Sequence, residues 1–236
     1  MITRNQIIHY TSDELIRVSI ALTTGIVEKA RQRHNLSPVA SAALGRTMTG
    51  AALLAGDYKN HEGVSLKVAG DGPLGAVHAD CFDTNKLRGY VDNPQVDLPL
   101  KANGKLDVAA GVGQHGQLTV TRFTPEKTTY TSQADLVSGE IAEDIAYYLF
   151  TSEQVPSTIS LGVLVSQDYT IAAAGCKAAL RKTVKSGRFQ PPSQYSFRPF
   201  QRYPKKLHRI LHVLKSPVER LQGDCAMVIT FRQPRF

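Results

Sequence analysis

The stretch GVSLKVAGDGPLGAVHADCF, residues 63–82, decides the fold class of this chain. In its first eight residues the apolar Val64, Leu66 and Val68 alternate with other side chains, which is the period of a half-buried strand. DGPLG is a turn, because aspartate, glycine and proline each favour turn geometry. AVHADCF then resumes an extended pattern, so the stretch predicts two strands joined by a tight turn.

Helices are predicted on the N-terminal side of these strands. Residues 37–56 begin with Ser37 as an N-cap and Pro38 at the first helical position, where the missing amide has no cost. This segment is rich in alanine and glycine and can pack closely against a neighbour. Residues 11–35 carry hydroxyl and carboxylate groups at their start and apolar residues at helical spacing, which predicts a first helix.

Further strands and one more helix are predicted on the C-terminal side. The predicted strands are residues 86–94, 116–124, 128–133, 158–166 and 169–175. Residues 138–156 predict a helix that is capped by Ser138 and limited by Pro156. Helices at both ends of an antiparallel run of strands indicate an α+β fold, with sheets packed against helices.

No constellation of residues predicts catalysis. GDGPLG and GVGQHG contain glycines, but each lies next to a strand and neither opens a helix, so neither is typical of a phosphate-binding loop. His115 is expected to be an exposed loop residue, and Glu140, Glu143 and Asp144 are expected on a solvated helix face. We predict no catalytic, cofactor-binding or metal-binding residues, and a binding scaffold rather than an enzyme.

Composition bounds the location of the protein. No run of about 18 apolar residues occurs, so no membrane span is expected, and the N-terminus lacks the pattern of a secretory signal. The three cysteines, Cys81, Cys176 and Cys225, are an odd number and far apart, which argues against a disulfide framework. We expect a cytoplasmic protein.

Five motifs occur in an order that resembles a known family. They are VAGDGPLGAVHAD, LRGYVDNP, GQLTVTRF, YYLFTSEQVPSTISLGVLV and AAAG. Over about residues 5–175 the chain resembles the 33 kDa chaperonin family, the redox-regulated heat-shock holdases. The resemblance implies an N-terminal domain that presents apolar surface to unfolding clients without consuming nucleotide. Its implied partners are unfolded or partly folded proteins, with a possible homodimer, and no membrane.

The resemblance also implies a zinc site that this sequence does not provide. In the family, a C-terminal lid binds zinc through four cysteines spaced C-x-C and C-x-x-C, and their oxidation releases the metal and exposes the client surface. Neither spacing occurs here. His208 and His212 are four residues apart, but their segment is typical of a basic amphipathic helix. We therefore expect no cofactor in this chain and no redox switch.

Charge divides the chain at the end of the resemblance. Residues 177–236 contain 14 Lys+Arg against two carboxylates, a net charge of +12, whereas residues 1–176 carry 14 against 18, a net of −4. We predict a chaperone N-terminal domain over residues 1–175 and a basic, poorly ordered tail over residues 176–236. The tail has three interpretations, of which we favour the third. It is a nucleic-acid-binding arm, an extension without a dedicated role, or an out-of-frame translation that begins near Gly175.

Two functions follow from these interpretations. The first is an ATP-independent holdase that binds unfolding or oxidatively damaged proteins as part of a stress response. The alternative is a nucleic-acid-binding protein that uses the basic tail.

Overall fold

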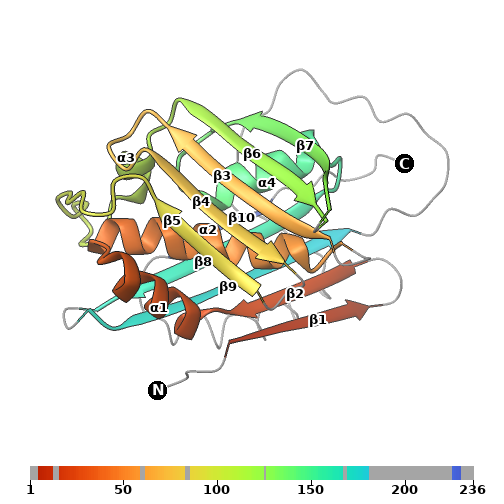
Figure 1. Ribbon diagram of the computed structural model, residues 1–236, viewed down its shortest axis with the longest axis horizontal. Coiled ribbons are helices and arrows are strands. Elements are labelled where there is room, and N and C mark those ends of the chain that lie inside the picture. Colours follow the sequence, from red (N-terminus) through yellow and green to blue (C-terminus); the bar gives the residue numbers. More distant parts are fainter. Residues whose placement is uncertain are drawn as a thin grey trace.

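The chain forms two antiparallel sheets with a helix between them (Figure 1). The computed structural model describes residues 5–12, 16–58, 62–82, 86–124, 126–166, 169–180 and 225–229. Sheet A contains, in spatial order, β1 (Gln6–Ser12), β2 (Ile16–Leu22), β9 (Ile171–Leu180), β8 (Ser157–Val165) and β10 (Cys225–Ile229). Sheet B contains, in spatial order, β5 (Lys86–Val91), β4 (Ala76–Phe82), β3 (Gly63–Gly70), β6 (Gly116–Phe123) and β7 (Thr128–Asp135). The helices are α1 (Thr24–His34), α2 (Pro38–Ala55), α3 (Val108–Val112) and α4 (Ala142–Thr151). The predicted α+β class is confirmed.

Helix α2 is the centre of the core, because it packs against strands of both sheets (Figure 1). Every residue of α2 after Pro38 is buried. The Ser37 hydroxyl accepts a hydrogen bond from the Ala40 amide at 3.2 Å, so the predicted cap is confirmed. Small residues set how closely α2 approaches its neighbours. A Cβ on Gly45 would lie 2.8 Å from Val163 of β8, which is closer than side chains pack.

The helix predicted over residues 11–35 is wrong in its first half. Residues 6–12 and 16–22 pair antiparallel as β1 and β2, and α1 begins only at Thr24. The apolar side chains within residues 16–22 recur at every second position, as in a strand. Some of them are also four residues apart, and this helical spacing led to the wrong prediction. Thr11 and Ser12, the expected caps, lie in β1, and the carboxylates Asp13 and Glu14 of the start signal lie outside the described residues. β2 instead pairs with β9, so a contact far along the chain decides its structure.

The start of α4 also differs from the prediction. The helix begins at Ala142 and not beside Ser138, whose hydroxyl accepts from the Glu140 amide at 3.1 Å within the preceding turn. The five-residue α3 was not predicted. The predicted strands of both sheets are confirmed, with β6 and β7 forming the expected hairpin.

Sheet A continues past the predicted domain boundary at residue 175. β9 runs through Gly175 to Leu180, and β10 pairs with β8 from a position much later in the chain. Lys177 is 1% exposed, and its ammonium donates to the Leu53 carbonyl at 3.0 Å and forms an ion pair with Asp57. Burial lowers the pKa of Lys177, against the opposing effect of Asp57. Residues 176–180 are therefore part of the folded unit. Residues 181–224 and 230–236 lie outside the described residues.

Candidate functional site

The outer face of sheet A is apolar. In the register of the sheet, Ile8 of β1 lies opposite Ile20 of β2, which lies opposite Cys176 of β9. The alternate positions face inward: a Cβ on Gly175 would lie 2.8 Å from Thr49 of α2. We call the outward apolar set the apolar platform. It consists of Ile8, Tyr10, Ile16, Val18, Ile20, Leu22, Leu164, Ala172, Ala174, Cys176 and Ala178.

None of the platform residues belongs to the hydrophobic core around α2, although Val18 is buried. Tyr10 is 60% exposed and Ile8 is 47% exposed. The remaining outward positions of β1, β2, β8 and β9 with described side chains are Gln6, Thr158, Ser160 and Gly162, of which Ser160 is buried. This described face thus carries no charged side chain, and a continuous uncharged surface of this kind is typical of a binding site.

The outer face of sheet B has the opposite character. His78 lies opposite Lys67 and Tyr90, and Arg88 donates to the Asp80 carboxylate at 2.9 Å. The other polar side chains of this face are Ser65, Lys86, Gln117, Thr119, Thr121, Thr131, Gln133 and Asp135. Phe82 and Phe123 form a stacked pair with ring centroids 6.2 Å apart. Both sheets pack their inner faces on α2, so the contrast in polarity concerns their outer faces. The polar and charged outer face of sheet B is suited to contact with water.

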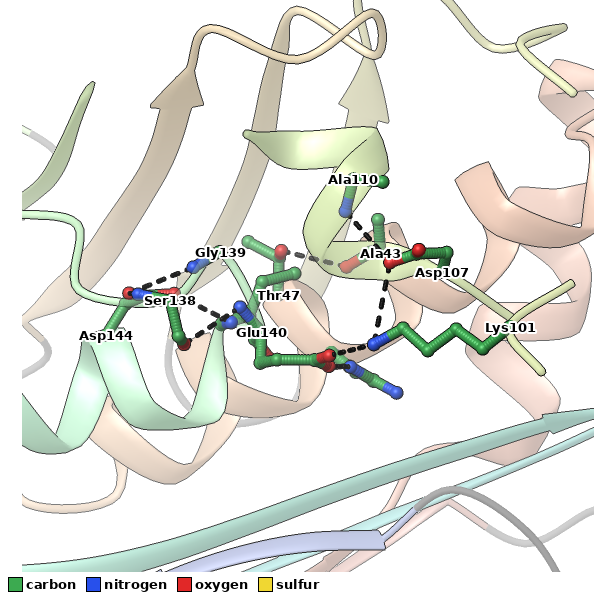
Figure 2. Close-up of polar contacts among 11 residues, drawn as sticks. Ala43, Thr47, Lys101, Asp107, Ala110, Ser138, Gly139, Glu140 and Asp144 are labelled. Atoms are coloured by element: carbon green, nitrogen blue, oxygen red, sulfur yellow. Dashed lines mark hydrogen bonds and ion pairs between the residues drawn. The ribbon is translucent and has the colours of Figure 1, made fainter. Parts of the chain in front are cut away.

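A polar network around the buried Arg46 holds α2 against the loops that lead to α3 and α4 (Figure 2). Arg46, in the middle of α2, is 3% exposed and donates to Glu140 Oε2 at 2.6 Å. Lys101 donates to Glu140 Oε1 at 2.7 Å and lies 3.5 Å from Asp107 Oδ1. That carboxylate accepts from the Ala110 amide at 3.0 Å and caps α3. Burial opposes the ionisation of Glu140, but the Lys101 and Arg46 cations outweigh it and hold its pKa below the usual value.

Asp144 closes the turn before α4. Its side chain is fully buried and accepts hydrogen bonds from the amides of Val137 at 2.8 Å, Ser138 at 3.0 Å and Ile141 at 2.8 Å. The expectation that Glu140 and Asp144 lie on a solvated helix face is therefore wrong. A carboxylate at the third position of a helix often accepts from the preceding backbone, and this signal at Asp144 could have been recognised.

The two glycine-containing loops considered for phosphate binding pack against each other. The Gly72 amide donates to the Val112 carbonyl at 2.9 Å, and the Leu74 amide donates to the Gly111 carbonyl at 3.0 Å. A Cβ on Gly72 would lie 2.4 Å from the Gly111 carbonyl oxygen, so close backbone packing explains the glycine. These amides are engaged by carbonyls and do not form an anion site. His115 is exposed, as predicted.

The described cysteines do not fit a zinc site. Cys81 is buried on the inner face of β4, whereas Cys176 lies on the outer face of β9 in the other sheet. Within the described ranges, no group of three or more His, Cys, Asp or Glu side chains is placed to hold a metal ion. His208 and His212 lie outside the described residues.

Glu153, from the SEQ-x-P motif, joins three elements. It accepts two hydrogen bonds from Arg122 of β6, at 2.5 and 2.6 Å, and one from the Tyr148 hydroxyl of α4 at 2.8 Å. The Arg122 guanidinium lies 4.0 Å from the ring centroid of Tyr58, which follows α2. The motif thus has a structural role at the ends of α2 and α4.

Replacing Tyr148 with phenylalanine is expected to lower the free energy of unfolding by about 1.5–3 kcal/mol, the range for a hydrogen bond to a charged group. Tyr148 is fully buried, and its hydroxyl bonds both Glu153 and Ser132. Tyr147→Phe is the matched control, because the Tyr147 hydroxyl has no hydrogen-bond partner among the described residues. Urea unfolding of both variants measures the difference. Equal midpoints for the two variants would contradict this role of Tyr148.

Comparisons with known proteins agree with the fold. The family model described as Hsp33 protein matches residues 5–178. The 33 kDa chaperonin of Desulforamulus reducens is 51% identical over 164 residues, which are 70% of this chain and 55% of that protein. The 33 kDa chaperonin of Bacillus subtilis is 45% identical over 163 residues, 69% of this chain and 56% of that protein.

A solved structure shares the architecture. The crystal structure of the 33 kDa chaperonin from Thermotoga maritima superposes with a TM-score of 0.71 at 43% sequence identity, covering 76% of this chain and 62% of that chain. The chain spans about half the length of the curated relatives that it matches. In the described part of the chain, no helix combines the length and the apolar character that crossing a membrane requires.

Proposed function

This chain belongs to the Hsp33 protein family, and on that premise we propose that it is a holdase, a chaperone that binds unfolding proteins without consuming nucleotide and prevents their aggregation. It acts by binding alone, in the cytoplasm, and catalyses no reaction. Its partners are proteins that have lost part of their structure under stress.

The observation that carries this proposal is the apolar platform. Unfolding proteins expose apolar segments, and burying apolar surface from both partners is the main favourable term in such association. A face without charged side chains adds no desolvation penalty, because no buried charge is left unpaired. Contacts of this kind are not directional, so the platform can accept clients of many sequences.

The polar networks support the platform from the inner side. The Arg46–Glu140–Lys101–Asp107 network and the Glu153 cluster hold α2 to the rest of the fold. Sheet A packs on α2, so the platform is the outer surface of a rigid layer. A rigid surface loses little conformational entropy when a client binds.

Activity is proposed to be independent of oxidation. The sequence contains no C-x-C or C-x-x-C pair, and the two cysteines with described side chains lie in different sheets. The chain as given thus offers no thiol set for a zinc-linked switch. The nucleic-acid alternative depends on basic residues that lie outside the described residues, and no described feature favours it.

Light scattering of a heated client enzyme tests this function. The client is heated with and without this protein, in dithiothreitol and in hydrogen peroxide, with an inert protein of similar size as control. We expect suppression of scattering to the same extent under both conditions. Suppression that appears only after peroxide treatment would overturn the independence from oxidation, and no suppression by a folded, soluble protein would overturn the holdase function.

A further inference from the structure

Strand β8 has the sequence of a central strand. STISLGVLV contains no charged residue and no proline, and its inward residues Ile159, Leu161 and Val163 are at most 1% exposed. Natural edge strands are protected from pairing by charges, prolines or bulges. The edge strand β5 of sheet B follows this rule with Lys86 and Arg88, whereas β8 has no such protection. Its sequence is suited to pairing with a neighbour on each side.

One neighbour of β8 is β9, and the other is β10. β10 pairs antiparallel with β8 in a register that runs from Cys225 opposite Gly162 to Ile229 opposite Thr158. It returns to the sheet after residues 181–224, which is a far longer connection than the β8–β9 hairpin. The five residues CAMVI are uncharged, although residues 177–236 carry a net charge of +12.

We propose that the edge of β8 is a strand-accepting site, occupied here by the chain's own Cys225–Ile229, and that an extended, uncharged apolar segment of an unfolding protein takes this place when that segment leaves. This inference rests on the proposed holdase function and assigns it a second contact beside the apolar platform. Backbone hydrogen bonds supply affinity for any extended sequence, because every residue except proline carries the same donor and acceptor.

Tethering makes the built-in occupant a strong competitor. Because Cys225–Ile229 belongs to the same chain as β8, their pairing is intramolecular, and a free peptide must exceed the effective concentration of this segment to displace it. Weakening the pairing of β10 should therefore increase the apparent affinity for free peptide. Two adjacent prolines weaken the pairing of β10 whichever of the two backbone amides points toward β8, because each proline removes one backbone donor.

Fluorescence anisotropy tests the site in the full-length chain. The probe is a fluorescein-labelled peptide with the sequence of residues 223–231, in which serine replaces the cysteine. The variant Met227→Pro/Val228→Pro should bind it at least about tenfold more tightly than the unmodified chain. Met227→Val/Val228→Ile, which keeps both backbone donors of the same positions, is the matched control and should bind as the unmodified chain does.

A second peptide separates strand pairing from unspecific apolar contact. It has the sequence of the first peptide, but alternate backbone nitrogens are methylated, which removes hydrogen-bond donors and keeps the side chains. This peptide should bind neither the unmodified chain nor either double variant. Equal binding of both peptides, or equal affinity of both double variants, would overturn the proposal. If the β10 variant does not fold, saturable binding of the unmethylated peptide alone to the unmodified chain still supports the site, and its absence at millimolar peptide refutes it.

Aggregation suppression, measured on the same samples, distinguishes the two proposals. Peptide binding at the edge without suppression would refute the holdase function and leave the strand-accepting site standing. Suppression without selective peptide binding would refute the site and leave the function standing.

Discussion

Replacing Glu140 with glutamine is expected to lower the free energy of unfolding by about 3–5 kcal/mol, the usual cost of breaking a buried ion pair from one side. Arg46 is 3% exposed and would keep its charge, but it would lose the carboxylate that it meets at 2.6 Å. Lys101 would lose the same partner. Because domains of this size are stable by only about 5–15 kcal/mol, the loss is a large fraction of the total. Urea unfolding at pH 7 measures it.

Glu28→Gln is the matched control. Glu28 pairs with Arg31 three residues along α1 at 2.7 Å, on the surface of the fold. Such pairs contribute well under about 1 kcal/mol, so the control should differ little from the unmodified chain. Similar losses of unfolding free energy in both variants would show that the burial of Arg46 adds nothing to the stability of the fold.

The pH dependence of this difference has a defined sign. The pKa of Glu140 in the folded protein is lowered from its ordinary value of 4.5, so its contribution is complete above pH 4.5 and is lost as the pH falls through the folded value. The stability difference between the unmodified chain and Glu140→Gln should therefore shrink as the pH falls below about 4.5. A difference that grows with acidity would contradict the assigned ion pairs.

Local signals predicted most of the sheet B strands and α2. The alternation in residues 63–70 and the Ser37–Pro38 start of α2 depend on residues that are close in sequence, and both are confirmed. The hairpin of β1 and β2 could not be predicted in the same way. Residues 16–22 fit a helix and a strand almost equally, and the choice is made by pairing with β9, about 150 residues later.

Some features of the candidate site could likewise be predicted from nearby residues, whereas others depend on residues that only the fold brings together. The absence of the family's cysteine spacings could be recognised directly in the sequence. The network of Arg46 and Glu140 could not, because these residues are 94 positions apart and only the fold places them together. The apolar platform also depends on the fold. Its members come from four strands, and only the pairing of Ile8, Ile20 and Cys176 shows that they share a face.

Introducing charge on the apolar platform is expected to reduce aggregation suppression at least about tenfold, since a lysine in an apolar interface must be desolvated without a partner. Ile8 and Tyr10 are suited to this test because they are 47% and 60% exposed. The double variant Ile8→Lys/Tyr10→Lys should therefore fold with little change in stability. Its thermal midpoint should stay close to that of the unmodified chain.

Sheet B offers a matched control. Tyr90 of β5 is 48% exposed, Gln133 of β7 is also exposed, and both lie on the outer face. The double variant Tyr90→Lys/Gln133→Lys adds the same charge to the same fold. It should suppress aggregation as well as the unmodified chain, because the outer face of sheet B already carries charged side chains.

The most direct test of the client-binding role of sheet A is the light scattering of one heated client in the presence of these two double variants at equal concentration. The structure predicts that Ile8→Lys/Tyr10→Lys loses suppression while Tyr90→Lys/Gln133→Lys keeps it. Full suppression by the folded Ile8→Lys/Tyr10→Lys variant, or equal loss in both, would show that clients do not bind on the apolar platform.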